Sequence, residues 1–157
     1  MPQFTTKRRL RHSAGQMFDL VADVERYPEF VPLCKTLRID SRQPLENGRE
    51  RVIATMTVAY KLIRETFVSD VELDEPNNMI VVRYKEGPFR ELENRWVFNP
   101  ISDDRCELDF FLDYEFKSRM LERLMGAMFD RAFRKFATAF ETRAATIYGR
   151  SRLAANS

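Results

Sequence analysis

The feature that most constrains the fold is a single apolar stripe along residues 118–148, which follows a long succession of strand-like segments. Ser118 is a candidate N-cap and Gly149 a candidate C-terminal stop, so the spacing predicts one helix of about 46 Å. The stripe comprises Leu121, Leu124, Met125, Met128, Phe129, Ala132, Phe133, Phe136, Phe140 and Ile147. A face this broad has to be covered by other elements, and the preceding strands are available to cover it.

Residues 36–116 supply those strands, because apolar and polar residues alternate through most of this region. The clearest alternation places Cys106, Leu108, Phe110, Leu112, Tyr114 and Phe116 on one face. Turn signals around residues 46–48, 75–78, 86–89 and 99–104 separate the segments, and such short connections predict antiparallel neighbours. Residues 3–11 alternate in the same way and predict a further strand.

The predicted fold is therefore α+β, a curved antiparallel sheet of six or seven strands wrapped round one long C-terminal helix. Ser13 and Gln16 form a candidate capping box for a short helix after the first strand. With 157 residues, one domain is expected over residues 1–150, followed by a frayed tail at 151–157. Gly126 is expected to mark a bend or a close approach, because glycine costs a helix about 1 kcal/mol relative to alanine.

Large apolar side chains dominate the interior, since the chain has 13 Phe, 5 Tyr and 1 Trp. A sheet of this size, curved over one helix, encloses more volume than the helix fills. The remaining volume is either packed with side chains or left as a cavity. Periodicity does not separate the two, although Met and Phe at helical spacing more often form a core.

The chain offers few groups for catalysis or metal binding. Its one histidine, His12, ends the first strand, and neither Cys34 nor Cys106 has another cysteine or a histidine near it in sequence. The polar face of the last strand carries Glu107, Asp109, Asp113 and Glu115, and their strict alternation favours a solvated, salt-bridged surface over acid–base chemistry. The sequence predicts a binding protein rather than an enzyme, with no catalytic residue, no metal and no cofactor beyond a bound ligand.

Charge is unevenly distributed. Residues 1–12 carry four basic residues and no acidic one, and residues 117–157 carry nine basic and three acidic residues. Such segments are either solvated faces that keep a protein soluble or contacts for an anionic surface, whether a lipid leaflet or RNA. The start of the chain has no apolar run, and we expect a cytoplasmic protein that is at most peripheral at the inner membrane.

Several segments carry a family resemblance when taken in order. They are Phe18-Asp19-Leu20-Val21-Ala22-Asp23-Val24, Tyr27-Pro28-Glu29-Phe30-Val31-Pro32-Leu33-Cys34, Gly87-Pro88-Phe89, Trp96-Val97-Phe98 and Leu112-Asp113-Tyr114-Glu115-Phe116. With them, the chain resembles the coenzyme-Q-binding family of the START-like (helix-grip, polyketide cyclase or lipid-transport) superfamily, whose bacterial members include the ribosome-association toxin. The resemblance implies a deep apolar cavity between sheet and helix. It also implies an isoprenoid quinone (ubiquinone-like) or other lipid as ligand, and a role in respiration or quinone biosynthesis.

The expected ligand-binding residues are Phe30, Val31, Leu33, Pro88, Phe89, Trp96, Phe98, Phe110, Tyr114, Met125, Phe129 and Phe133. The Tyr27–Leu33 segment and the Gly87–Phe89 turn are expected to flank the cavity mouth, because both carry apolar side chains at chain breaks where the local pattern does not bury them. An anionic membrane surface is the natural contact for such a mouth.

Two other functions remain open at this level. One is a ribosome-associated factor or toxin that blocks subunit association, supported by the basic first strand and basic helix. The other is a cyclase or dehydratase, as in distant members of the superfamily, against which stands the lack of catalytic residues.

Overall fold

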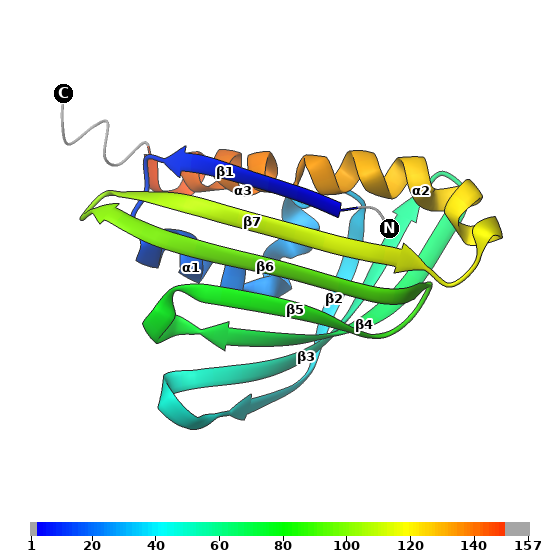
Figure 1. Ribbon diagram of the computed structural model, residues 1–157, viewed down its shortest axis with the longest axis horizontal. Coiled ribbons are helices and arrows are strands. Elements are labelled where there is room, and N and C mark those ends of the chain that lie inside the picture. Colours follow the sequence, from blue (N-terminus) through cyan, green and yellow to red (C-terminus); the bar gives the residue numbers. More distant parts are fainter. Residues whose placement is uncertain (1–2, 150–157) are drawn as a thin grey trace.

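The computed structural model describes residues 3–149 and shows seven antiparallel strands in one curved sheet, with the helices on its concave side (Figure 1). The strands are β1 (Gln3–Leu10), β2 (Cys34–Pro44), β3 (Arg49–Tyr60), β4 (Ile63–Asp74), β5 (Met79–Glu86), β6 (Phe89–Ser102) and β7 (Arg105–Phe116). Their order across the sheet is β1-β7-β6-β5-β4-β3-β2. The predicted α+β architecture is confirmed, and the predicted tail at 151–157 lies outside the described residues.

The two edge strands are joined by the longest connection of the sheet. It carries α1 (Ala14–Ala22) and the 3₁₀ helix η1 (Val24–Glu29). The predicted capping box opens α1: the Ser13 hydroxyl accepts from the Gln16 backbone N–H at 3.0 Å, and the Gln16 side chain accepts from the Ser13 N–H at 3.1 Å. This box satisfies N–H groups that the first helical turn leaves without partners.

The turns between strands follow their sequence signals. Asn47 and Gly48 have φ values of 62° and 76° in the β2–β3 connection, as tight hairpin turns require. Gly87, in the β5–β6 turn, has φ of 138°, and a Cβ there would lie 2.5 Å from the Phe67 Cβ. Only glycine therefore lets this turn fold back against β4.

The C-terminal helix is bent rather than continuous. It consists of α2 (Arg119–Arg134), α3 (Phe136–Ala144) and a π turn, η4 (Ala145–Gly149), and Figure 1 shows α2 and α3 following one another along the sheet. The bend lies at Lys135, whose N–H donates to the Ala132 carbonyl at 3.0 Å in a tighter, three-residue turn. The expectation that Gly126 marks a bend or a close approach is wrong, because a Cβ there would make only an ordinary contact at 3.6 Å.

The sheet face and the helix stripe meet as predicted, with two corrections. The six residues that alternate on one face of β7, from Cys106 to Phe116, are all buried, together with Met125, Phe129 and Phe133 of α2. Leu124 and Ile147, which the pattern assigns to the same stripe, are exposed instead. They lie at the margin of an apolar stripe wider than the sheet covers.

Candidate functional site

A cavity of about 90 Å³ lies between the sheet and the C-terminal helices. Strands β2 to β7 each contribute side chains to its wall, because every second residue of a strand points to the concave face. The helices close the other side with Phe129 and Phe133 from α2 and with Phe136 and Phe140 from α3. Because residues before and after the bend at Lys135 line the same space, α2 and α3 cover one cavity.

Two of the three polar side chains in the wall already have hydrogen-bond partners. The Tyr27 hydroxyl donates to the Val21 carbonyl, and burial raises the pKa of Tyr27 above its ordinary value, so the phenol stays protonated. The Asn94 amide donates to the Phe111 carbonyl at 2.9 Å and accepts from the Trp96 indole N–H at 2.7 Å. Both side chains are therefore held in place by the fold.

Ser69 is the third polar residue of the wall. It is buried in β4, and among the described residues no hydrogen bond engages its hydroxyl. Its strand neighbours on this face, Phe67 and Val71, are apolar. A ligand with a carbonyl or hydroxyl oxygen would find one uncommitted donor in an otherwise apolar wall.

The cavity is small for a ligand site. Sites for small molecules usually enclose roughly 300–1,000 Å³, whereas this space of about 90 Å³ equals the liquid volume of about three water molecules. Leu33, Leu37, Met56, Val82 and Phe136 line it while being only half-buried. These side chains have room to move outward, so a larger ligand requires the wall to open.

Five of the twelve predicted ligand-binding residues line the cavity, namely Val31, Leu33, Trp96, Phe129 and Phe133. The others lie elsewhere in or beside the core: Phe30, Pro88, Phe89, Phe98, Phe110, Tyr114 and Met125. Phe98 and Phe110 pack near Trp96, with ring centroids at 6.2 and 4.8 Å from the indole. They support the wall from behind rather than forming it.

The expectation that Pro88 and Phe89 are exposed at the mouth is wrong. Phe89 is fully buried, and its ring lies 5.0 Å from Phe116 and 5.5 Å from Phe129. The close approach at Gly87 turns this segment inward and explains the burial. Phe30 is half-buried against Phe140 and beneath the Arg143 guanidinium.

The sequence did contain a signal for the polar residues that were missed. Ser69 and Asn94 each stand where the alternation calls for an apolar residue, between Phe67 and Val71 and between Leu92 and Trp96. A polar residue in the buried phase of a strand costs stability unless it is paired, and so it indicates a specific partner. Phe136 and Phe140 were recognised as apolar but were not assigned to the site.

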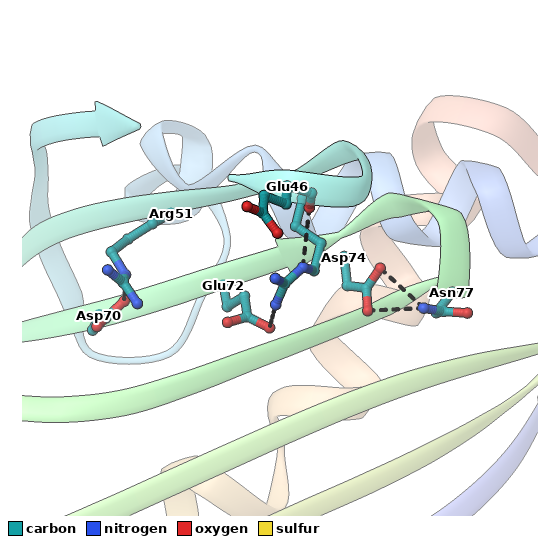
Figure 2. Close-up of polar contacts among 7 residues, drawn as sticks. Glu46, Arg51, Asp70, Glu72, Asp74 and Asn77 are labelled. Atoms are coloured by element: carbon teal, nitrogen blue, oxygen red, sulfur yellow. Dashed lines mark hydrogen bonds and ion pairs between the residues drawn. The ribbon is translucent and has the colours of Figure 1, made fainter. Parts of the chain in front are cut away.

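Several carboxylates on the outer face of the sheet are engaged in structural contacts, although no ion pair involves Asp113 in the described part of the chain. Figure 2 shows Arg51 facing Asp70, with 3.2 Å between guanidinium and carboxylate, and the buried Asp74 accepting from the Asn77 amide at 3.0 and 3.3 Å. Glu107 and Asp109 of β7 pair with Arg9 and Lys7 of β1, as the alternation predicted.

The two cysteines and the histidine lie buried in the fold. Burial raises the pKa of the Cys34 and Cys106 thiols to about 11, so neither is a thiolate at neutral pH. His12 is buried beside Tyr148. Within residues 3–149, no group of three or more His, Cys, Asp or Glu side chains is placed to hold a metal ion, and no helix is long and apolar enough to cross a membrane.

Comparison with known proteins agrees with this geometry. Residues 10–141 match the family described as polyketide cyclase/dehydrase and lipid transport. The ribosome association toxin RatA of Escherichia coli K12 is 34% identical over 94% of this chain and 90% of its own length. The mitochondrial coenzyme Q-binding protein COQ10 homolog B of Xenopus laevis is 33% identical over 94% of this chain and 60% of its own length.

A solved structure extends the agreement to three dimensions. The solution structure of the 18 kDa protein CC1736 from Caulobacter crescentus is 32% identical to this chain, with a TM-score of 0.74 over 95% of this chain and 99% of that one. The chain therefore belongs to the polyketide cyclase/dehydrase and lipid-transport family, and within it to the START-like group that includes RatA and the COQ10 homologues.

Proposed function

We propose that this protein binds the head group of an isoprenoid quinone or a similar lipid in the cavity between the sheet and helices α2 and α3. The observation that carries the proposal is an apolar wall, closed by four phenylalanines, with a single uncommitted hydroxyl at Ser69. The coenzyme Q-binding name of a relative that is 33% identical supports the choice of a quinone. A role in respiration or quinone biosynthesis, exercised from the cytoplasm at the inner membrane, follows from that ligand.

The physical basis is the match between wall and ligand. Each Å² of apolar surface removed from water contributes roughly 25 cal/mol, so a prenylated ring gains several kcal/mol from a dry wall. The Ser69 hydroxyl would donate to a quinone carbonyl and fix the orientation of the ring. The cavity has to widen from about 90 Å³, which the half-buried lining side chains permit.

Trp96 provides a direct test. It is the only tryptophan of the chain and it lines the cavity. Quinones accept an electron from excited indole, so a short-chain ubiquinone bound in the cavity should quench the protein fluorescence in a saturable way. Extraction of purified protein with organic solvent should return the quinone chemically unchanged, as expected of a binder rather than an enzyme.

A matched pair of variants sharpens this test. Ser69→Ala should weaken quinone affinity by roughly tenfold, the effect of one lost hydrogen bond of about 1.4 kcal/mol. Thr57→Ala, which removes a hydroxyl from the outer face of β3, should leave affinity unchanged. Absence of saturable quenching in the wild type, or equal affinities for wild type and Ser69→Ala, would contradict the proposal.

Ribosome binding is a second candidate function, favoured by the 34% identity to ribosome association toxin RatA. The basic side chains of α2, including Arg123 and Arg131, are its best physical support. Binding to RNA should weaken steeply as salt rises, whereas occupancy of a dry cavity should hardly respond. Sedimentation with ribosomal subunits at low and high salt separates the two functions.

A further inference from the structure

Exposed apolar side chains gather at one end of the molecule. Leu62, at the tip of the β3–β4 hairpin, is 101% exposed, and Tyr60 beside it is 41% exposed. On α2, Met120 and Leu124 are 66% and 62% exposed. Figure 1 shows the β3–β4 connection and the start of α2 at the same, right-hand end of the fold.

A groove of about 470 Å³ joins these two elements. Tyr60 and Ile63 line it from the hairpin, and Leu124 and Met128 line it from α2. Pro32, Leu33 and Ala132 line both this groove and the cavity. These three residues therefore form the partition between the exposed apolar surface and the proposed ligand site.

Arg131 and Lys135 line this groove, and four further cations lie on the hairpin and on α2. Within the described part of the chain, no ion pair involves Lys61, Arg64, Arg119, Arg123, Arg131 or Lys135. The acidic residues of α2 are Glu122 and Asp130, and Asp130 is already paired with Arg134 at 3.1 Å. Glu122 and Glu65 of β4 have no ion pair in the described part of the chain, but the six cations outnumber them, so the surface around the groove carries a net positive charge.

Arginines of the outer sheet face behave differently. At the other end of the sheet, Arg49 and Arg51 of β3 pair with Glu72 and Asp70 of β4, the latter contact being visible in Figure 2. The fold thus neutralises these two guanidinium groups, whereas Arg83 of β5, also on the outer face, has no ion pair in the described part of the chain. Around the exposed aliphatic side chains, by contrast, six cations that form no ion pair with any described residue lie on the β3–β4 hairpin and along α2 as far as Lys135.

We propose that this end of the molecule, comprising the β3–β4 tip and the outer face of α2, docks on an anionic lipid bilayer. Aliphatic side chains that protrude fully, as Leu62 does, gain free energy in an acyl layer but find no apolar pocket on folded RNA. The surrounding Lys and Arg side chains complement anionic head groups. This proposal rests on the proposed function in one respect. An isoprenoid ligand that resides in the bilayer would reach the cavity through the groove, by passing between Pro32, Leu33 and Ala132.

Vesicle flotation tests this surface. The wild type should float with phosphatidylcholine vesicles that contain phosphatidylglycerol, and only weakly with pure phosphatidylcholine. Leu62→Ser combined with Leu124→Ser should lower binding to the anionic vesicles by at least about tenfold. Arg119→Glu combined with Arg123→Glu should reduce binding to the level seen with pure phosphatidylcholine.

Ile101→Ser is the matched control, because Ile101 is 53% exposed but lies beside the β6–β7 turn, at the other end of the strands. It should bind vesicles like the wild type. Equal binding by the Leu62→Ser, Leu124→Ser variant, or an equal loss in Ile101→Ser, would overturn the proposal. Binding to ribosomal RNA in place of vesicles, abolished by the arginine changes but not by the leucine changes, would overturn it as well.

Quenching of Trp96 by a short-chain quinone in vesicle-free buffer keeps the two proposals apart. Quenching without vesicle binding would refute the docking surface and leave the cavity function standing. Vesicle binding without quenching would refute the cavity function and leave the docking surface standing.

Discussion

Replacing Ala54 with leucine should fill the cavity and exclude the ligand without unfolding the protein. Ala54 is buried in β3, lines the cavity and pairs with Ser69 across the β3–β4 ladder. A leucine at this position would occupy the empty space and lie over the Ser69 hydroxyl. Ligand contacts and the proposed hydrogen bond would be lost together.

The expected stability change follows from the volume. Filling about 90 Å³ at roughly 24 cal/mol per Å³ recovers about 2 kcal/mol, and strain from imperfect fit costs about 1–3 kcal/mol. The free energy of unfolding should therefore change by less than about 2 kcal/mol in either direction. Quinone affinity should fall by more than about tenfold, because the site no longer has room to form.

Ala137→Leu provides the matched comparison. Ala137 of α3 is as buried as Ala54 but does not line the cavity, so the same substitution overpacks the core with nothing to offset the strain. Urea unfolding measures stability in both variants, and Trp96 quenching measures affinity. If Ala54→Leu destabilises as much as Ala137→Leu, the cavity does not have room for the added side chain; if Ala54→Leu still binds quinone like the wild type, the cavity is not the ligand site.

Three further outcomes are expected. Gly126→Ala should raise the free energy of unfolding by about 0.5–1 kcal/mol and the melting temperature by roughly 2–4 °C, because the added Cβ meets no close neighbour; an unchanged or lower melting temperature would contradict this. Phe89→Ala should lower the free energy of unfolding in urea by about 3–5 kcal/mol, since the ring is fully buried among aromatic neighbours; a loss below about 1 kcal/mol would instead indicate that Phe89 is exposed at the cavity mouth. Burial raises the pKa of Cys34 and Cys106 from 9.0 to about 11, so between these values the folded state keeps protons that the unfolded chain has released. Stability should fall as pH rises through that window, and the double change to alanine should flatten the fall.

The fold was predictable because its signals are local and mutually consistent. The apolar face of β7 has to be covered by another element, and the apolar stripe of the C-terminal helix has to be covered by a sheet. Short turns between antiparallel strands leave little freedom in how the strands connect. The bend at Lys135 was not predictable in this way. No helix-breaking residue marks it, because lysine is a good helix former, whereas Gly126, the residue with the weakest helix propensity in α2, lies in a regular turn.

The site was predictable only in part, for a reason that Phe89 makes clear. An apolar residue at a chain break has no periodic partner, so sequence alone leaves its direction open. Here the positive φ and close approach at Gly87 turn the segment into the core. Of the five expected residues that line the cavity, Trp96 lies on the concave face of β6 and Phe129 and Phe133 lie on the apolar stripe of α2, where periodicity sets the direction of the side chain. Val31 and Leu33 lie in the loop before β2, where it does not.

The wall between groove and cavity has a backbone feature that bears on how the space opens. Leu33 has φ of 68°, a left-handed conformation that costs a residue with a Cβ roughly 1–2 kcal/mol. Its carbonyl accepts one hydrogen bond, from the Ala59 N–H at 3.0 Å, and such a bond contributes about 0.5–1.5 kcal/mol. Moving Leu33 outward would give up that bond but would also relieve the strain, so the two terms nearly cancel. Elsewhere the wall is formed mostly by residues of paired strands and by phenylalanines of α2 and α3, and although some of these side chains are half-buried, moving their backbone would break several contacts at once. We therefore expect the wall to open first at the partition that contains Leu33, which faces the surface on which the exposed leucines and unpaired cations lie.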